Sequence, residues 1–315
     1  MQKSSPAHLT AVLQALFVTF LWSTSWVLIK IGLQDIPALT FAGLRYVLAA
    51  TCLLPFLLRP ASISTLRSLT RRDWARLITL GLLFITIAQG AQFLGLALLP
   101  TVTVSLLLNF TPIFVVLMGI PLLAERPTRF QWLGITLYLA GIVVYFYPLF
   151  LPGTQVAGAF IMLLAVAANA ASSVLGRHIN RETHLSPIIV TATSMAVGSV
   201  VLLGVGAVTQ GLPNLTPVNW LIVVWLAVVN TAFAFTLWNH TLRTISAMQS
   251  SVINGTMLAQ IAFLAWLFLG EHLTWKQVVG MALVALATLI VQLRSTKDKR
   301  SKRKDAKGTK NAKLC

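Results

Sequence analysis

The sequence predicts an all-α integral membrane protein of ten transmembrane helices, arranged as two inverted repeats of five helices. Three observations predict this fold. The 315 residues are 57% hydrophobic and 10% charged, with a mean hydropathy of +0.83, a composition that soluble domains do not have. Long stretches carry no charge, and one span needs about 20 apolar residues. Finally, one motif occurs twice with a constant offset.

The apolar stretches give the spans in chain order. They cover residues 9–29, 38–58, 77–124, 130–176, 183–242, 244–270 and 274–293. Three of them are long enough for two helices each, and turn residues at Pro100, Pro152 and Pro213 divide these three. Four single spans and three pairs make ten helices.

The repeated motif relates the two halves of the chain. The pattern Glu-x-x-Thr-x-x-Gln-x-x-Gly begins at Glu125 and again at Glu271, 146 residues later (271 − 125 = 146). Five spans separate equivalent points, so the halves must have opposite orientations in the membrane. The expected domains are a cytoplasmic N-terminus (1–8), a first repeat (9–147), an inverted second repeat (154–293) and a basic disordered tail (294–315).

Basic residues indicate which loops face the cytoplasm, because Lys and Arg collect in short cytoplasmic loops. In alternate loops the chain has Arg59, Arg67, Arg71, Arg72, Arg76, Arg126, Arg129, Arg177, Arg181 and Arg243. The opposite loops, around Pro100, Pro152 and Pro213, have none. We therefore expect both termini in the cytoplasm, with Glu125 on the cytoplasmic side and Glu271 on the outer side.

The net charge of +17 does not indicate a nucleic-acid partner. Much of the excess lies in the tail after Lys297, which has no aromatic residue to stack bases. We expect this tail to interact with anionic lipid headgroups. The two cysteines, Cys52 and Cys315, cannot form a CxxC metal site, and no P-loop pattern occurs, so we expect no metal, cofactor or nucleotide.

Several short segments carry a resemblance to a known family. They are Leu21-Trp22-Ser23, Lys30-Ile31-Gly32, Phe41-Ala42-Gly43-Leu44-Arg45-Tyr46, Asn109-Phe110-Thr111-Pro112-Ile113-Phe114 and the two copies of the Glu-x-x-Thr motif. In their order and spacing over residues 11–293, the chain resembles the EamA-type permeases of the drug/metabolite transporter superfamily. The resemblance implies a ten-helix carrier of the bacterial inner membrane that exports amino acids or similar small metabolites. Because Leu258 stands where the first half has Pro112, we expect a helix break in the fourth span and none in the ninth.

Polar side chains inside apolar spans are the candidates for a substrate path, because each is costly unless it is paired or hydrated. Arg45 lies about seven residues inside the second span, roughly 10 Å from its outer end. Two roles are open for it. It could dock a substrate carboxylate, or it could reach outward or bind carbonyls that fix the helices, a role that its place nearer the outer boundary favours.

The other candidates are neutral or lie near span ends. We expect a central cavity lined by Trp22, Arg45, Gln89, Gln92, Asn109, Asn169, Trp238, Asn239 and Asn254, although the ordinary role of a single amide is an interhelical hydrogen bond. We expect gating or structural roles for Lys30, Pro112, Glu125 and Glu271.

The seven acidic residues all lie in loops, the tail or helix ends, so no carboxylate is expected at the midplane. A proton-coupled antiporter usually has such a group. The sequence therefore predicts a secondary carrier, not an enzyme, that exports or exchanges amino acids or related metabolites by alternating access. Two alternatives stay open. One is proton-coupled efflux of lipophilic drugs or cations, which Trp-rich walls would suit. The other is an enzyme on lipid-linked substrates, which would need clustered acids or His ligands. The oligomeric state is not predicted.

Overall fold

A computed structural model describes residues 6–123, 129–147, 153–182, 185–241, 253–288 and 290. Within these ranges every regular element is a helix. The predicted tail and Glu125 lie outside the described residues. So do residues 242–252, at the start of the predicted ninth span.

The first half of the chain holds the elements up to the end of α8. They are α1 (Pro6–Gly32), α2 (Ala38–Leu57), α3 (Pro60–Arg67), α4 (Arg71–Gly81), the π-helix η1 (Leu82–Gln89), α5 (Gly90–Leu98), α6 (Thr101–Leu108), α7 (Thr111–Leu123) and α8 (Arg129–Phe146). The second half holds α9 (Gly153–Glu182), α10 (Pro187–Gln210), α11 (Pro217–Ala227), the π-helix η2 (Val228–Phe233), α12 (Ala234–Thr241), α14 (Met257–Leu269) and a final helix over Trp275–Thr288.

Among the described residues, five helices are long and apolar enough to cross a membrane. They cover Leu9–Gly32, Ala38–Leu57, Arg71–Leu98, Gly153–Gly176 and Pro187–Gln210. Five shorter apolar helices cover Thr101–Val115, Trp132–Phe146, Pro217–Phe233, Ile253–Leu269 and Trp275–Thr288. The predicted turns at Pro100 and Pro213 fall between helices, and Pro152 lies outside the described residues. The protein is therefore an all-helical membrane protein, and the short helix α3 is an addition that lies in a predicted loop.

Helix starts recur at equivalent places in the two halves. Thr70 caps α4 by accepting a hydrogen bond from the backbone N–H of Asp73 at 3.2 Å. Thr216, 146 residues later, caps α11 in the same way through Asn219, also at 3.2 Å. Each cap satisfies a backbone donor that the first turn would otherwise leave unpaired. The constant offset of the motif is thus matched by local structure.

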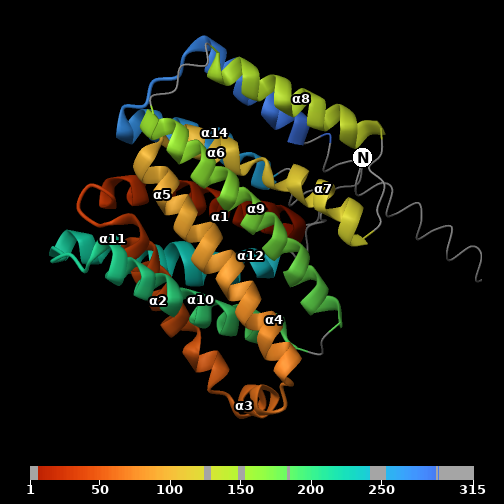
Figure 1. Cartoon of the computed structure of the whole chain (residues 1–315), viewed down its shortest axis with the longest axis vertical. Coiled ribbons are helices and arrows are strands. Elements are labelled where there is room, and N and C mark those ends of the chain that lie inside the picture. Colours follow the sequence, from red (N-terminus) through yellow and green to blue (C-terminus); the bar gives the residue numbers. More distant parts are fainter. Residues whose placement is uncertain are drawn as a thin grey trace, which may run out of the picture.

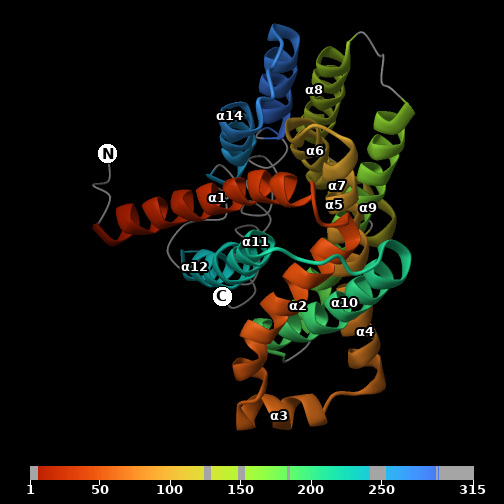
Figure 2. The same cartoon turned by 90° about the vertical axis from the view of Figure 1, so that its left-hand side faces the viewer.

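The long helices α2, α4–α5, α9 and α10 cross one another, and α1 packs mainly against α14 and α12 beside them (Figures 1 and 2). The rod formed by α4, η1 and α5 runs beside α9, while α10 packs along α2. Figure 2 shows α8 and the final helix (blue) together at one end of the molecule, and α3 at the opposite end, where it connects α2 to α4. The largest cluster of buried apolar side chains joins α1, α2, η1, α5 and α10, and holds the region described below in place.

Small residues set the closest contact between helices. A Cβ on Gly43 of α2 would lie 2.5 Å from the Cα of Leu203, and a Cβ on Gly206 of α10 would lie 2.5 Å from the backbone nitrogen of Thr40. Real Cβ atoms do not approach that closely. Glycine at both positions therefore lets the α2 and α10 backbones touch.

The expectation of a helix break in the first half alone is wrong. The chain leaves the helix at Asn109 and Phe110, just before Pro112, and leaves it again at Thr256, which is Phe110 plus 146. At both breaks backbone N–H groups bond to the carbonyl three residues back: Phe110 to Leu107 at 3.0 Å, and Thr256 to Ile253 at 3.1 Å. In the second break Thr256 Oγ1 also donates to the Ile253 carbonyl at 2.6 Å. A local side-chain bond of this kind competes with the helix, so proline is not required.

Candidate functional site

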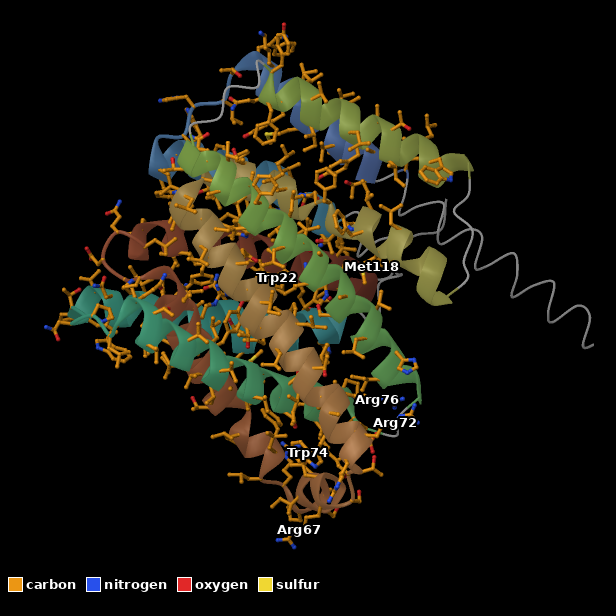
Figure 3. All side chains as sticks on the ribbon, in the orientation of Figure 1. Trp22, Arg67, Arg72, Trp74, Arg76 and Met118 are labelled. Atoms are coloured by element: carbon orange, nitrogen blue, oxygen red, sulfur yellow. The ribbon has the colours of Figure 1, made fainter. Side chains whose placement is uncertain are left out.

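Polar side chains from both halves of the chain meet at the centre of the molecule. We call this group the central polar cluster. It comprises Trp22, Thr24, Arg45, Tyr46, Gln89, Asn230 and Thr231. Its members come from α1, α2, η1 and η2. Trp22 lies near the middle of the view in Figure 3, far from the arginines gathered around α3 and the start of α4.

Arg45 is buried and makes its contacts across the two halves. Its side chain is 6% exposed. Both Nε and one terminal nitrogen donate to the hydroxyl of Thr231 at 3.3 Å, and the guanidinium carbon lies 5.3 Å from the centre of the Tyr46 ring. Arg45 thus neither reaches outward nor bonds to a carbonyl among the described residues, and its bond to Thr231 joins α2 to η2. No carboxylate contacts Arg45 among the described side chains.

The neighbour of Arg45 extends the cluster to the third predicted span. Tyr46 donates its hydroxyl hydrogen to Oε1 of Gln89 at 2.7 Å. Gln89 is the last residue of η1 and is half-buried. A buried cation and an amide are thus linked through one tyrosine, and the amide hydrogens of Gln89 are left to donate elsewhere.

Asn230 joins α1 to η2 and leaves one acceptor unused. Its Nδ2 donates to the carbonyl of Leu21 and to Oγ1 of Thr24, the latter at 3.3 Å. Trp22 Nε1 in turn donates to the backbone carbonyl of Asn230 at 3.1 Å. The Asn230 side chain is fully buried, yet its Oδ1 has no partner among the described atoms. Such an oxygen is an acceptor for a ligand or a water, because leaving it unpaired is costly.

Two π-helices position these groups, and they begin 146 residues apart, at Leu82 and Val228. A π-helical turn is wider than an α-helical one, and such turns occur often at functional sites. In η2 the hydroxyl of Thr231 donates to the carbonyl of Leu226, five residues back, at 2.8 Å. This bond leaves the oxygen lone pairs of Thr231 facing Arg45.

An aromatic group borders the cluster on the α12 side. The ring of Trp22 lies 5.2 Å from Phe235 and 5.2 Å from Trp238, both in tilted arrangements. Trp22 and Trp238 were predicted to line the same cavity, and the structure does bring them together. Both are half-buried.

The remaining cavity candidates lie elsewhere or bond locally. Asn109 donates to the carbonyl of Ser105 in its own helix at 2.8 Å, and Asn169 of α9 donates to the Thr111 hydroxyl at 3.3 Å. Gln92 is half-buried on α5, one turn beyond Gln89, and Asn254 is exposed beside the second break. The side chain of Asn239 lies outside the described set.

The predicted gating residues near span ends bond to helix termini. Lys30 Nζ donates to the carbonyls of Leu96 and Leu99 at 2.6 and 2.8 Å. The carboxylate of Glu271 accepts from the backbone N–H groups of Thr101 and Val102 at 2.7 and 3.2 Å. Pro112 lies in the first turn of α7, directly after the break.

Comparison with known proteins identifies the family. The sequence model of the EamA-like transporter family matches residues 9–147 and 156–293. The chain belongs to the EamA-like transporter family. A solved crystal structure of a protein matches the fold with a TM-score of 0.65 over 90% of this chain and 98% of that one, at 19% sequence identity.

Curated relatives of this EamA-like chain are named as transporters. A "Probable amino-acid metabolite efflux pump" of Salmonella typhimurium is 29% identical over 286 residues, covering 86% of this chain and 90% of the relative. The Escherichia coli protein of the same name is 29% identical over 285 residues, with coverages of 86% and 90%. The uncharacterized transporter YoaV of Bacillus subtilis is 27% identical over 274 residues, covering 85% and 91%. These names point to membrane transport and not to an enzyme.

Four members of the cluster in this EamA-like transporter, Thr24, Tyr46, Asn230 and Thr231, were not among the cavity residues predicted from the sequence. Tyr46 was noticed only as part of a family segment, and Thr231 was not singled out at all. Threonine is common in membrane helices, so Thr231 carries no signal by itself. The adjacent pair Asn230-Thr231 inside an apolar span was the available hint.

Proposed function

We propose that this EamA-like protein is a secondary carrier of the bacterial inner membrane that exports or exchanges amino acids or related small metabolites by alternating access. In this proposal ten helices form two inverted five-helix repeats, 9–147 and 154–293, and both termini face the cytoplasm. Support comes from the two stretches that the family model matches. It also comes from the helix caps, π-helices and helix breaks that recur at the same offset.

The contact between Arg45 and Thr231 is the observation that carries the proposal. A buried guanidinium with a hydroxyl as its acceptor is poorly compensated, since the usual partner of such a cation is an anion. A substrate carboxylate is therefore a better ligand for Arg45 than Thr231 is. Because Thr231 belongs to the other half of the chain, such a substrate would loosen a contact between the halves, and binding would promote movement.

The hydrogen-bond acceptors in the cluster suit the ammonium group of an amino acid. The unpaired Oδ1 of Asn230 can accept a hydrogen bond from a substrate ammonium group. The relatives named as amino-acid metabolite efflux pumps support the same substrate class. We therefore assign the α-carboxylate to Arg45 and the α-ammonium group to Asn230.

Counterflow in liposomes tests this proposal. Liposomes containing the purified protein are loaded with one unlabelled amino acid, and uptake of the labelled compound is followed without an ion gradient. We expect uptake for at least one amino acid, and loss of that uptake in the Arg45→Gln variant. Arg72→Gln is the matched control, because Arg72 is exposed at the start of α4, and it should transport normally. Equal uptake by Arg45→Gln and the wild type would overturn the role of Arg45.

The aromatic group of Trp22, Phe235 and Trp238 supports a second candidate, efflux of lipophilic cations. The two candidates differ in charge preference. Quenching of tryptophan fluorescence by a cationic dye, together with uptake that requires an imposed proton gradient, would favour the second. Counterflow of an amino acid that the dye does not inhibit would exclude it.

A further inference from the structure

A cavity lies apart from the central polar cluster, at the end of α1 near Lys30. Its volume is about 480 Å³, within the range of small-molecule sites, which is about 300–1,000 Å³. Its lining includes Lys30, Gln34, Leu99, Leu269 and Glu271, so helices from both halves of the chain contribute. In the proposed orientation this cavity opens toward the outer face.

Lys30 presents to this cavity an ammonium group that has only two of its three N–H donors bonded among the described residues. Two of its N–H bonds point to the carbonyls of Leu96 and Leu99 at the end of α5. An ammonium group has three donors, so one is left for a ligand. The two backbone bonds fix the position of the charge, and a fixed charge loses little entropy when a ligand binds.

Glu271 presents to the same cavity a carboxylate that can accept further hydrogen bonds. Each of its oxygens accepts one backbone N–H, from Thr101 and from Val102, at the beginning of α6. Each oxygen has a second lone pair for another donor. Gly270, with φ of +66°, makes the sharp turn after α14 that brings Glu271 to this place.

The two opposite charges face one cavity without neutralising each other. The Lys30 ammonium group is within electrostatic range of the Glu271 carboxylate. In the described part of the chain, however, they do not form an ion pair within 4.0 Å, because each is held by backbone groups of a different helix end. A ligand that carries both charges can satisfy both groups at once. In an α-amino acid one carbon separates the carboxylate from the ammonium group, so one molecule carries both charges close together.

We propose that this cavity is an outer recognition site for zwitterionic α-amino acids. The ligand carboxylate binds the Lys30 ammonium group and the ligand ammonium group binds the Glu271 carboxylate. The apolar side chains of Leu99 and Leu269 receive the ligand side chain. The inference rests on the proposed function for its substrate class and adds a second site, so that one chain binds two ligand molecules.

Equilibrium binding to the purified full-length protein in detergent tests the inference. The probe is the labelled amino acid that gives counterflow, and the quantity measured is the number of molecules bound per chain. We expect two bound molecules per chain for the wild type. We expect one per chain for Arg45→Gln, and one for Lys30→Met or Glu271→Gln. The site retained in Arg45→Gln should select for both charges. There, the methyl ester and the N-acetyl derivative of the same amino acid should each compete at least about tenfold more weakly than the zwitterion.

Lys30 and Glu271 also cap helices, so replacing them could change the fold. A variant that keeps both side chains is therefore needed as well. Ala97→Trp fills the cavity from an exposed position on α5 and leaves both caps intact. It should also bind one molecule per chain, with an unchanged thermal midpoint. One molecule per wild-type chain, lost in Arg45→Gln and kept in Ala97→Trp, would overturn the outer site while leaving the proposed function in place. Failure of the proposed function would appear instead as a lack of amino-acid counterflow by the wild type.

Discussion

At the scale of single residues, Arg45 and Thr231 form a pair that can be tested without transport. Replacing Thr231 with Val removes the acceptor of a buried cation while keeping the shape of the side chain. We expect this change to lower the free energy of unfolding by about 1.5–3 kcal/mol, the usual value for a hydrogen bond to a charged group. A thermal unfolding midpoint in detergent, lower than that of the wild type, would show the effect.

Thr209→Val is the matched control for this pair. Thr209 is exposed on α10 and its hydroxyl bonds only to the carbonyl of Val205, so its loss should change the midpoint little. The double variant Arg45→Met/Thr231→Val should be less destabilised than the sum of the single variants, because the two residues interact. Additive effects would contradict the contact.

The sequence identifies Arg45 but not its partner, for a physical reason. A charge inside an apolar span stands out because it is costly there. Its acceptor lies 186 residues away in another helix, and a threonine is unremarkable in any span. A pair of this kind becomes visible only when the packing of α2 against η2 is known.

At the scale of helices, glycine decides how closely α2 and α10 approach. Gly206→Ala places a methyl group against the backbone of Leu39 and Thr40, so the helices must separate. We expect destabilisation by about 1–3 kcal/mol, as for overpacking of a tight core. Gly204→Ala, two residues earlier on the same helix, has open space around its Cβ and should be neutral or slightly stabilising. Equal thermal midpoints for the two variants would contradict the close approach.

Helix boundaries were largely predictable, whereas helix type was not. Pro100 and the segment around Pro213 interrupt the apolar stretches, and the helices end or begin beside them. The π-helices leave no comparable mark, because their sequences are as apolar as those of any span. The second break was not predicted, because proline was taken as the cause of a break and Leu258 stands in its place. At this break the hydroxyl of Thr256 bonds to the backbone instead.

At the scale of the whole molecule, the distribution of arginines predicts the orientation in the membrane. Single cysteines can test it in a background that lacks Cys52 and Cys315. Asn214→Cys, in the exposed turn before α11, should react with an impermeant maleimide added to intact cells. Ser64→Cys, exposed on α3, should react only after permeabilisation, because α3 lies among the arginines that are predicted to face the cytoplasm. The reverse labelling pattern would mean the opposite orientation.

The make-up of the central polar cluster also predicts how transport depends on pH. Neither a carboxylate nor a histidine is among its members as the structure describes them. Carboxylic acids and histidines are the groups whose ionisation usually changes in neutral to mildly acidic solution. We therefore expect the counterflow rate to stay nearly constant between about pH 5.5 and 7.5. A steep change in that interval, with the protein still folded, would mean that a titrating group takes part.

The matching start of the two π-helices bears on the history of the chain. An extra residue inserted into a helix rotates everything after it by about 100°, unless a widened turn absorbs the insertion. Such a turn is retained at Leu82 and at Val228, the same point of each half. On the proposed inverted repeat, one insertion in a half-length ancestral gene, copied by its duplication, would account for both turns. The widened turn would on that account be older than the full-length protein, and the two halves would have diverged around it.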